Sequence, residues 1–206
     1  MKHYNVIQKL FHDIVFSSKL INKSLFEVEK LFYLKNKKID INANIFITGL
    51  PRSGTTSLLN FIYSSNEYAS LKYKNMPFIL SPNFSKLFHK NNISKKERLH
   101  GDGITYDINS PEMFDEFFFN DNDIFVKNEI KNYIKLILLS ENKKKYLSKN
   151  NLVYQRIDLL SELLPNTNFL ITIREPLQHA YSLLNQHMKF IKLQQKDDFV
   201  RRYMNY

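Results

Sequence analysis

The loop Pro51–Ser57, with the sequence Pro-Arg-Ser-Gly-Thr-Thr-Ser, has the composition of a site for a phosphate group. An apolar run at residues 45–48 precedes it and a helix-like apolar pattern at 58–62 follows it, which predicts a strand, a loop and a helix in that order. The first amide groups of such a helix have no partner within the helix and can bind an anion. Arg52 adds a permanent charge. Hydroxyl groups come from Ser53, Thr55 and Thr56.

The two glycines of this region, Gly49 and Gly54, have the spacing of the phosphate loop of nucleoside triphosphatases, but Thr55 stands where that loop has its lysine. That lysine binds the β- and γ-phosphates, and the Ser or Thr after it holds Mg²⁺. A triphosphate site is therefore disfavoured. A site for one phosphate with a smaller transferable group needs neither the lysine nor a metal. A glycine-rich turn can also be no more than a turn, but the polar residues here favour binding.

Residues 51–56 resemble the 5′-phosphosulfate loop of sulfotransferases that use 3′-phosphoadenosine 5′-phosphosulfate (PAPS). Cytosolic members have Lys where Arg52 stands, whereas tyrosylprotein-type and many bacterial members have Arg. The resemblance implies that Pro51 to Ser57 bind the phosphosulfate, with Arg52 near the transferred group. It also implies that an Arg at a later strand end and a Ser eight residues further on bind the 3′-phosphate. Arg174 and Ser182 have this spacing, although alone they would be ordinary surface residues.

The resemblance gives a weaker match for the catalytic groups. Cytosolic members carry Lys-Thr-His before the second strand, and by placement Lys149 corresponds to that Lys, which would stabilise the leaving oxygen. Asn151 stands where the His would be, and an amide is no base. Other members place a Glu after the first helix, but residues 71–78 contain no carboxylate. The nearest alternative base is His100, oriented or replaced by Asp102; the competing interpretation is an incidental surface loop.

A further acidic group follows the dipeptide Ser110-Pro111, which has the pattern of a helix start. On that helix Glu112, Asp115 and Glu116 would share one face. We expect a solvated or acceptor-facing role for these three carboxylates rather than a metal site.

The rest of the chain predicts the elements that position these residues. Apolar strands alternate with helices, which favours a parallel sheet covered on both sides, with ligands at the carboxyl ends of the strands. The expected elements are helices within 4–35 (the second capped by Ser24 and Glu27), a strand at 45–47, an extended piece at 68–73, a helix over 123–147, a strand at 152–155, a helix at 159–164, a strand at 169–173 and a helix from Pro176 with an apolar stripe. The predicted fold is α/β, a P-loop-like three-layer fold with a central parallel sheet flanked by helices.

Composition adds few constraints. The chain has 206 residues, a net charge of +10 and no cysteine, which excludes disulfides and thiolate metal sites. The charge attracts polyanions, but a general abundance of lysine explains it equally well, and we expect no nucleic-acid partner. No signal peptide or transmembrane stretch is evident, so the expected location is cytoplasmic or peripheral to a membrane. We predict amphipathic N-terminal helices at 1–40 and a nucleotide-binding domain at 41–206 that is incomplete at its C-terminus.

These observations lead to one function and two alternatives. The leading hypothesis is a sulfotransferase that moves a sulfuryl group from PAPS, without a metal, to a hydroxyl or amine of a glycan, lipid, peptide or small alcohol. The first alternative is a P-loop nucleotide kinase-like protein, which would require ATP and Mg²⁺. The second is a truncated, non-catalytic fragment that binds 3′-phosphoadenosine 5′-phosphate (PAP).

Overall fold

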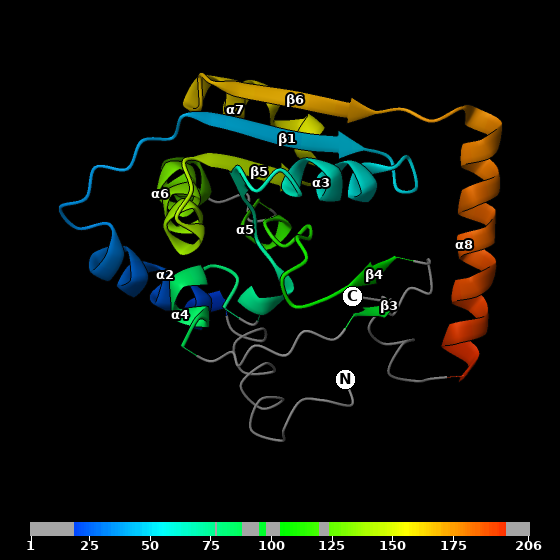
Figure 1. Ribbon diagram of the computed structural model, residues 1–206, viewed down its shortest axis with the longest axis horizontal. Helices are drawn as coiled ribbons and strands as arrows, with labels where there is room; N and C mark the ends of the chain where they lie inside the picture. The colour runs from blue at the N-terminus through cyan, green and yellow to red at the C-terminus, as the bar shows by residue number, and fades with distance from the viewer. Residues whose placement is uncertain (1–18, 77, 88–94, 98–103, 120–123, 197–206) are drawn as a thin grey trace.

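A four-stranded parallel sheet carries the loops predicted to bind the ligand. The computed structural model describes residues 19–76, 78–87, 95–97, 104–119 and 124–196. The strand order is β2-β5-β1-β6, with bounds β2 (Tyr68–Ala69), β5 (Lys145–Lys149), β1 (Ala43–Gly49) and β6 (Thr167–Thr172). All neighbouring strands are parallel, so their carboxyl ends lie at one edge of the sheet. Figure 1 shows these ends directed toward the long helix α8 (Pro176–Lys196).

Alternate side chains of the central strands enter apolar layers on opposite faces of the sheet. On one face Ile47 and Leu147 pack with Leu59 of α3 (Thr55–Tyr63). On the other, Phe46 and Tyr146 join a larger core that includes side chains of α2 (Lys19–Tyr33), α5 (Glu116–Phe119), α6 (Ile124–Glu141) and α7 (Ile157–Leu163). Full burial of each large side chain contributes roughly 1.5–3 kcal/mol. Helices therefore cover both faces, and the predicted three-layer α/β fold is confirmed.

Short elements connect these layers. They are η1 (Tyr73–Asn75), α4 (Pro82–Ser85), β3 (Lys96–Glu97), β4 (Thr105–Tyr106) and η2 (Val153–Arg156). Strands β3 and β4 form a separate antiparallel pair. No helix within the described ranges has the length and apolar character that crossing a membrane requires.

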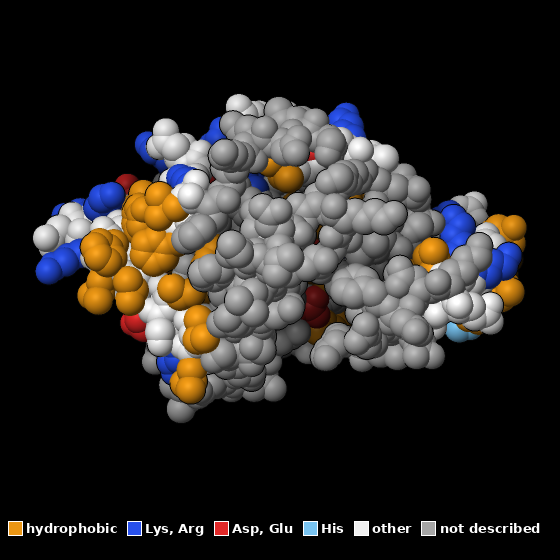
Figure 2. All heavy atoms as spheres, turned by 90° about the horizontal axis from the view of Figure 1, so that it is seen from below, with side chains coloured by type: hydrophobic (Ala, Val, Ile, Leu, Met, Phe, Trp, Pro, Cys, Tyr) orange, Lys and Arg blue, Asp and Glu red, His pale blue; other side chains and the backbone are white. Residues whose placement is uncertain are grey.

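Helix α2 is tied to the core by a buried carboxylate. Glu29 is fully buried and accepts hydrogen bonds from the backbone and side-chain amides of Asn83 and the backbone amide of Phe84, so it caps α4. Burial raises the pKa of Glu29, and these hydrogen bonds oppose the rise. The predicted cap at Ser24 is wrong, because the helix is already formed at Lys19. Apolar side chains of α2 also remain on the surface, among them Leu20, Leu31 and Phe32, and such side chains gather over this end of the molecule in Figure 2.

Three predicted elements are corrected. The helix predicted over 123–147 ends at Glu141, because Asn142 adopts a left-handed φ of 53° and reverses the chain into β5. A strand buried on both faces has no apolar alternation to distinguish it from a helix. Residues 153–156 form a 3₁₀ turn instead of a strand.

The segment that begins at Ser110-Pro111 is also different from its prediction. Pro111 forms a bridge with Lys72, and the Ser110 hydroxyl bonds Asp107, so the chain is extended here and α5 begins only at Glu116. The acidic residues 112, 115 and 116 therefore do not share a helix face.

Asp115, expected to be solvated, is buried against β5. Its Oδ2 accepts hydrogen bonds from the hydroxyls of Ser148 and Tyr146, the latter at 3.2 Å. Burial raises the pKa of Asp115 to about 7, although these hydrogen bonds act in the opposite direction. The side chain consequently serves the core and not the solvent-facing role predicted for it.

We predict that the free energy of unfolding of Asp115→Asn, relative to that of the native chain, increases as pH rises from about 4 to about 8. The folded-state pKa lies above the unfolded one, so the stability that the protonated group provides is complete below the unfolded pKa and is lost as pH rises through about 7. The pH-dependent change in the free energy of unfolding is roughly 4 kcal/mol or less. Urea unfolding at several pH values measures it, with Asp158→Asn on the surface of α7 as control. A difference that is constant across pH would contradict the assignment.

Candidate functional site

The two predicted motifs meet at the carboxyl edge of the sheet. Gly49 at the end of β1 is paired in register with Thr172 at the end of β6. The loop before α3 and the turn before α8 therefore begin from neighbouring strands. The resemblance implied that both motifs serve one ligand, and the pairing of β1 with β6 brings them to the same edge.

Gly49 allows the two strand ends to approach closely. Its φ is +152°, and a Cβ added there would lie against Thr172 Oγ1 and 2.8 Å from both Ser53 Oγ and the Thr172 carbonyl oxygen. The Ser53 hydroxyl donates to the Leu50 carbonyl at 2.7 Å and lies 2.6 Å from the Thr172 hydroxyl. Ser53 thus closes the loop and joins it to β6.

The side chain of His179 attaches helix α8 to the same loop. His179 is almost buried, and its Nε2 lies 2.7 Å from the Pro51 carbonyl oxygen. The sequence reasoning did not identify this residue. Its position one helical turn before Ser182 was the available signal, since residues three apart share a helix face.

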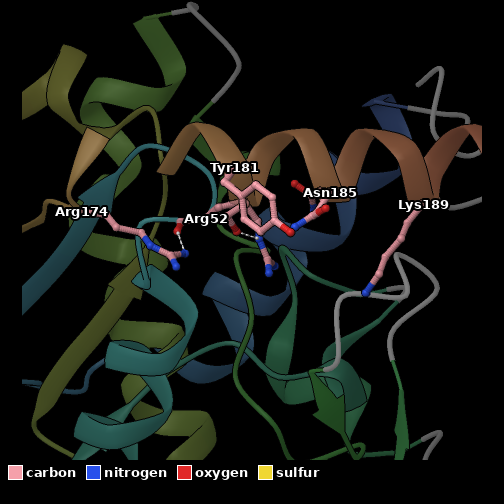
Figure 3. A pocket seen from close by; sticks show the side chains of 7 residues that line it. Arg52, Arg174, Tyr181, Asn185 and Lys189 are labelled. Carbon is pink, nitrogen blue, oxygen red and sulfur yellow. Dashed lines mark hydrogen bonds between the residues drawn. The ribbon is translucent and has the colours of Figure 1, made fainter. Parts of the chain in front are cut away.

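Arg52 is the point where both motifs converge. Its Nε donates to Ser182 Oγ at 3.3 Å, and its carbonyl oxygen accepts from Arg174 Nη1 at 3.2 Å. Arg52 has a left-handed φ of 71°, which is uncommon outside glycine. Figure 3 shows Arg52 and Arg174 beside the first turns of α8, with Tyr181 next to Arg52 and Lys189 further along the helix.

A cavity of about 290 Å³ lies at this convergence. It is lined by Arg52, Arg174, Tyr181, Ser182, Asn185, Gln186 and Lys189. Three cationic side chains and several hydrogen-bond donors thus surround one space, which suits an anion such as a phosphate. The first amides of α8 do not take part, because the Glu175 carboxylate accepts from the backbone amides of Leu177 and Gln178. These hydrogen bonds lower the pKa of Glu175.

A further cation, from the end of β5, lies at the start of α3. Thr55 and Thr56 are buried, whereas Ser57 is exposed. The ammonium group of Lys149, at the end of β5, donates to Thr56 Oγ1 at 3.0 Å. Gly54 precedes the helix with a left-handed φ of 102°.

The partner of Lys149 was not anticipated from the sequence. Lys149 Nζ donates to Glu112 Oε1 at 3.1 Å, and both side chains are largely buried. The sequence pattern predicts that Glu112 lies on a helix face, which is wrong. Its true position depends on the pairing of residues 71–72 with 111–112, for which no sequence pattern exists.

His100 and Asp102 lie outside the described residues. Asn151 accepts a hydrogen bond from the Thr48 hydroxyl through its backbone oxygen at 3.2 Å. In the described part of the chain no three His, Asp or Glu side chains cluster in a way that could hold a metal ion.

We predict that Gly49→Ala lowers the free energy of unfolding by more than Gly54→Ala. Both changes place a side chain at a left-handed φ, which costs roughly 1–2 kcal/mol. A Cβ at Gly54 meets no atom within 4 Å, whereas one at Gly49 meets Thr172 and Ser53. Urea denaturation of the two variants measures the difference, and equal losses would show that the strand ends can separate without cost.

Comparison with known proteins identifies the family. The profile of the Sulfotransferase family matches residues 44–205. A search of curated protein sequences finds no match.

Two solved structures share the fold. Sulfotransferase STF1 from Mycobacterium tuberculosis H37Rv is 16% identical with a TM-score of 0.50, and the match covers 82% of this chain and 54% of that one. Sulfotransferase STF9 from Mycobacterium avium is 13% identical with a TM-score of 0.52, covering 90% and 62%. The chain thus spans less than two thirds of the length of either protein, and at these identities the likeness concerns the fold alone. Since the family profile covers most of the sequence, this chain belongs to the sulfotransferase family.

Proposed function

We propose that this chain transfers a sulfuryl group from PAPS to a hydroxyl or amine of an acceptor. The observation that carries the proposal is the double contact of Arg52, with Ser182 through its side chain and with Arg174 through its carbonyl. PAPS has a phosphosulfate at one end and a 3′-phosphate at the other, so it offers one anionic group to each motif. Membership of the sulfotransferase family supports the same assignment.

The residues present fit PAPS. The amides at the start of α3, with Arg52, Thr55 and Thr56, would hold its 5′ end, and Arg174 and Ser182 would hold its 3′-phosphate. The other members of the loop, Pro51, Ser53, Gly54 and Ser57, would give it the required shape. Bound PAPS supplies a sulfuryl group attached to a phosphate that can leave.

Lys149 is proposed to stabilise the charge that develops on the departing phosphate oxygen. Its ammonium group already contacts Thr56 at the start of the loop helix. Donors fixed in place before the reaction need no reorganisation during it, and their effect on rate is large. Arg52 would act in the same way on the sulfonate oxygens.

The proton of the acceptor requires a base, and we propose His100 for this role with Asp102 to orient it.

The alternative function is an ATP-dependent kinase activity. Thr55 argues against it, because this residue stands where the phosphate loop of such enzymes has its lysine. We further propose PAP and a glycan, lipid, peptide or small alcohol as partners, residues 41–206 as the nucleotide-binding domain, and a cytoplasmic or membrane-peripheral location.

We predict that PAP and PAPS raise the unfolding temperature of the chain, whereas ATP with Mg²⁺ does not. A ligand that binds the native state alone stabilises it by about 2.7 kcal/mol at a hundredfold excess over its dissociation constant. Differential scanning fluorimetry measures the shift. Stabilisation by ATP with Mg²⁺ but not by PAP would contradict the proposal and favour the kinase.

The same assay tests the 3′-phosphate site. PAP should stabilise the native chain more than adenosine 5′-monophosphate, which lacks the 3′-phosphate. In Arg174→Ala this advantage should disappear, because the residue proposed to hold that phosphate is lost. An unchanged advantage would place the 3′-phosphate elsewhere. Stabilisation by PAP without transfer to a panel of hydroxyl and amine acceptors would indicate a binding protein.

For the proposed base, we expect His100→Ala to abolish sulfuryl transfer and to leave PAP affinity unchanged, because the imidazole would act on the acceptor and not on the nucleotide. Product formation from radiolabelled PAPS, together with calorimetric PAP binding, measures both effects. Full turnover by the variant would rule out His100 as the base.

A further inference from the structure

Glu112 and Lys149 form a largely buried ion pair. Their side chains are 12% and 8% exposed, and Lys149 Nζ lies 3.1 Å from Glu112 Oε1. Removing two charges from water is costly unless the geometry is good and both ions have additional hydrogen bonds. Each of these ions has such bonds, and they come from different elements.

Further hydrogen bonds hold the carboxylate of Glu112 in place. Its Oε2 accepts from the Tyr73 hydroxyl at 3.2 Å, and Oε1 also accepts from the Met113 backbone amide at 3.1 Å. The Glu112 backbone amide donates to the Leu71 carbonyl at 3.1 Å. Tyr73 in turn stacks on Tyr106 with ring centroids 4.1 Å apart. The carboxylate therefore has a defined position.

The ammonium group of Lys149 has three N–H donors. The bonds to Glu112 and to Thr56 use two of them. Asp115 accepts hydrogen bonds from Ser148 and Tyr146, and Glu67 pairs with Lys145 at the start of the strand. Successive side chains of a strand point to opposite faces, so Ser148 and Lys149 face different sides of the sheet. Glu112 is thus the carboxylate that pairs with Lys149, and within the described part of the chain no residue other than Glu112 and Thr56 accepts from the ammonium group.

We infer that Glu112 is a positioning residue for sulfuryl transfer: its carboxylate holds the Lys149 ammonium group against Thr56, at the start of the loop helix. The inference rests on the proposed function and assigns a role to a residue that the sequence motifs did not indicate. The partner class is a phosphosulfate whose bridging oxygen accepts the third N–H of Lys149.

The reaction balances without any proton passing through Glu112. The acceptor oxygen or nitrogen forms a bond to sulfur while the bond between sulfur and the phosphate oxygen breaks. The electron pair stays on that oxygen, where the N–H of Lys149 stabilises it. The acceptor proton goes to the proposed base, so Glu112 takes no part in proton transfer.

The test is a double-mutant cycle on nucleotide binding, measured by titration calorimetry with PAPS and PAP between pH 6.5 and 9. The variants are Glu112→Gln, Lys149→Met and the two combined. Glu112→Gln should weaken PAPS binding roughly ten- to a hundredfold, as expected for loss of a charge-assisted contact. The loss should grow with pH, because a buried lysine without its counter-charge loses its proton more readily. The combined variant should bind no more weakly than Lys149→Met.

Three further variants separate positioning from general damage. Glu112→Asp keeps the charge and should restore a flat pH dependence. Tyr73→Phe removes one donor to Glu112 without touching Lys149 and should produce a smaller loss in the same direction. Glu129→Gln breaks the remote pair with Lys30, 2.8 Å apart, and should bind PAPS as the native chain does.

Native affinity in Glu112→Gln and Tyr73→Phe at every pH, or additive losses in the combined variant, would overturn the inference. Failure of the native chain to bind PAP or PAPS would instead overturn the proposed function.

Discussion

The site depends on the parallel pairing of β1 with β6, and in particular on the close contact between Gly49 and Thr172. Because these strands end at the same level, the loop after β1 and the helix after β6 leave the sheet side by side. Ser53 and Thr172 then join the loop to the strand, and His179 joins it to α8. Arg52, Arg174 and Ser182 come together as a result, and two hydrogen bonds join them at Arg52.

A second group of contacts, around β5, fixes side chains near the carboxyl edge of the sheet. Polar side chains buried near β5 include Asp115 and Glu112, and both accept hydrogen bonds from residues of the strand. Polar groups at such depth require several partners each, which fixes their neighbours as well. The position of Lys149 beside the loop is therefore determined by chain segments that are distant from it in sequence.

The sequence permitted prediction of those parts of the fold that have a local signal. The apolar runs before residues 49 and 174 indicated the two strands, and the motif spacing indicated that Arg174 and Ser182 belong near the loop. The ion pair of Glu112 with Lys149 could not be predicted, since it depends on a bridge between Lys72 and Pro111. Strand β5 was missed because its residues are buried on nearly all sides and show no alternation. Ser110-Pro111 has the composition of a helix start, but the tertiary pairing of the chain overrides that preference.

The attachment of α8 has a mechanical consequence. The hydrogen bonds between this helix and the loop come from its first two turns, at His179 and Ser182. A helix of 21 residues extends for about 30 Å at 1.5 Å per residue. A rotation of roughly 10° about that attachment would displace the far end by about 5 Å, given this length. A small change in the backbone conformation of Pro51 and Arg52 would therefore be enlarged at Lys189 and Lys192, in the distal half of the helix.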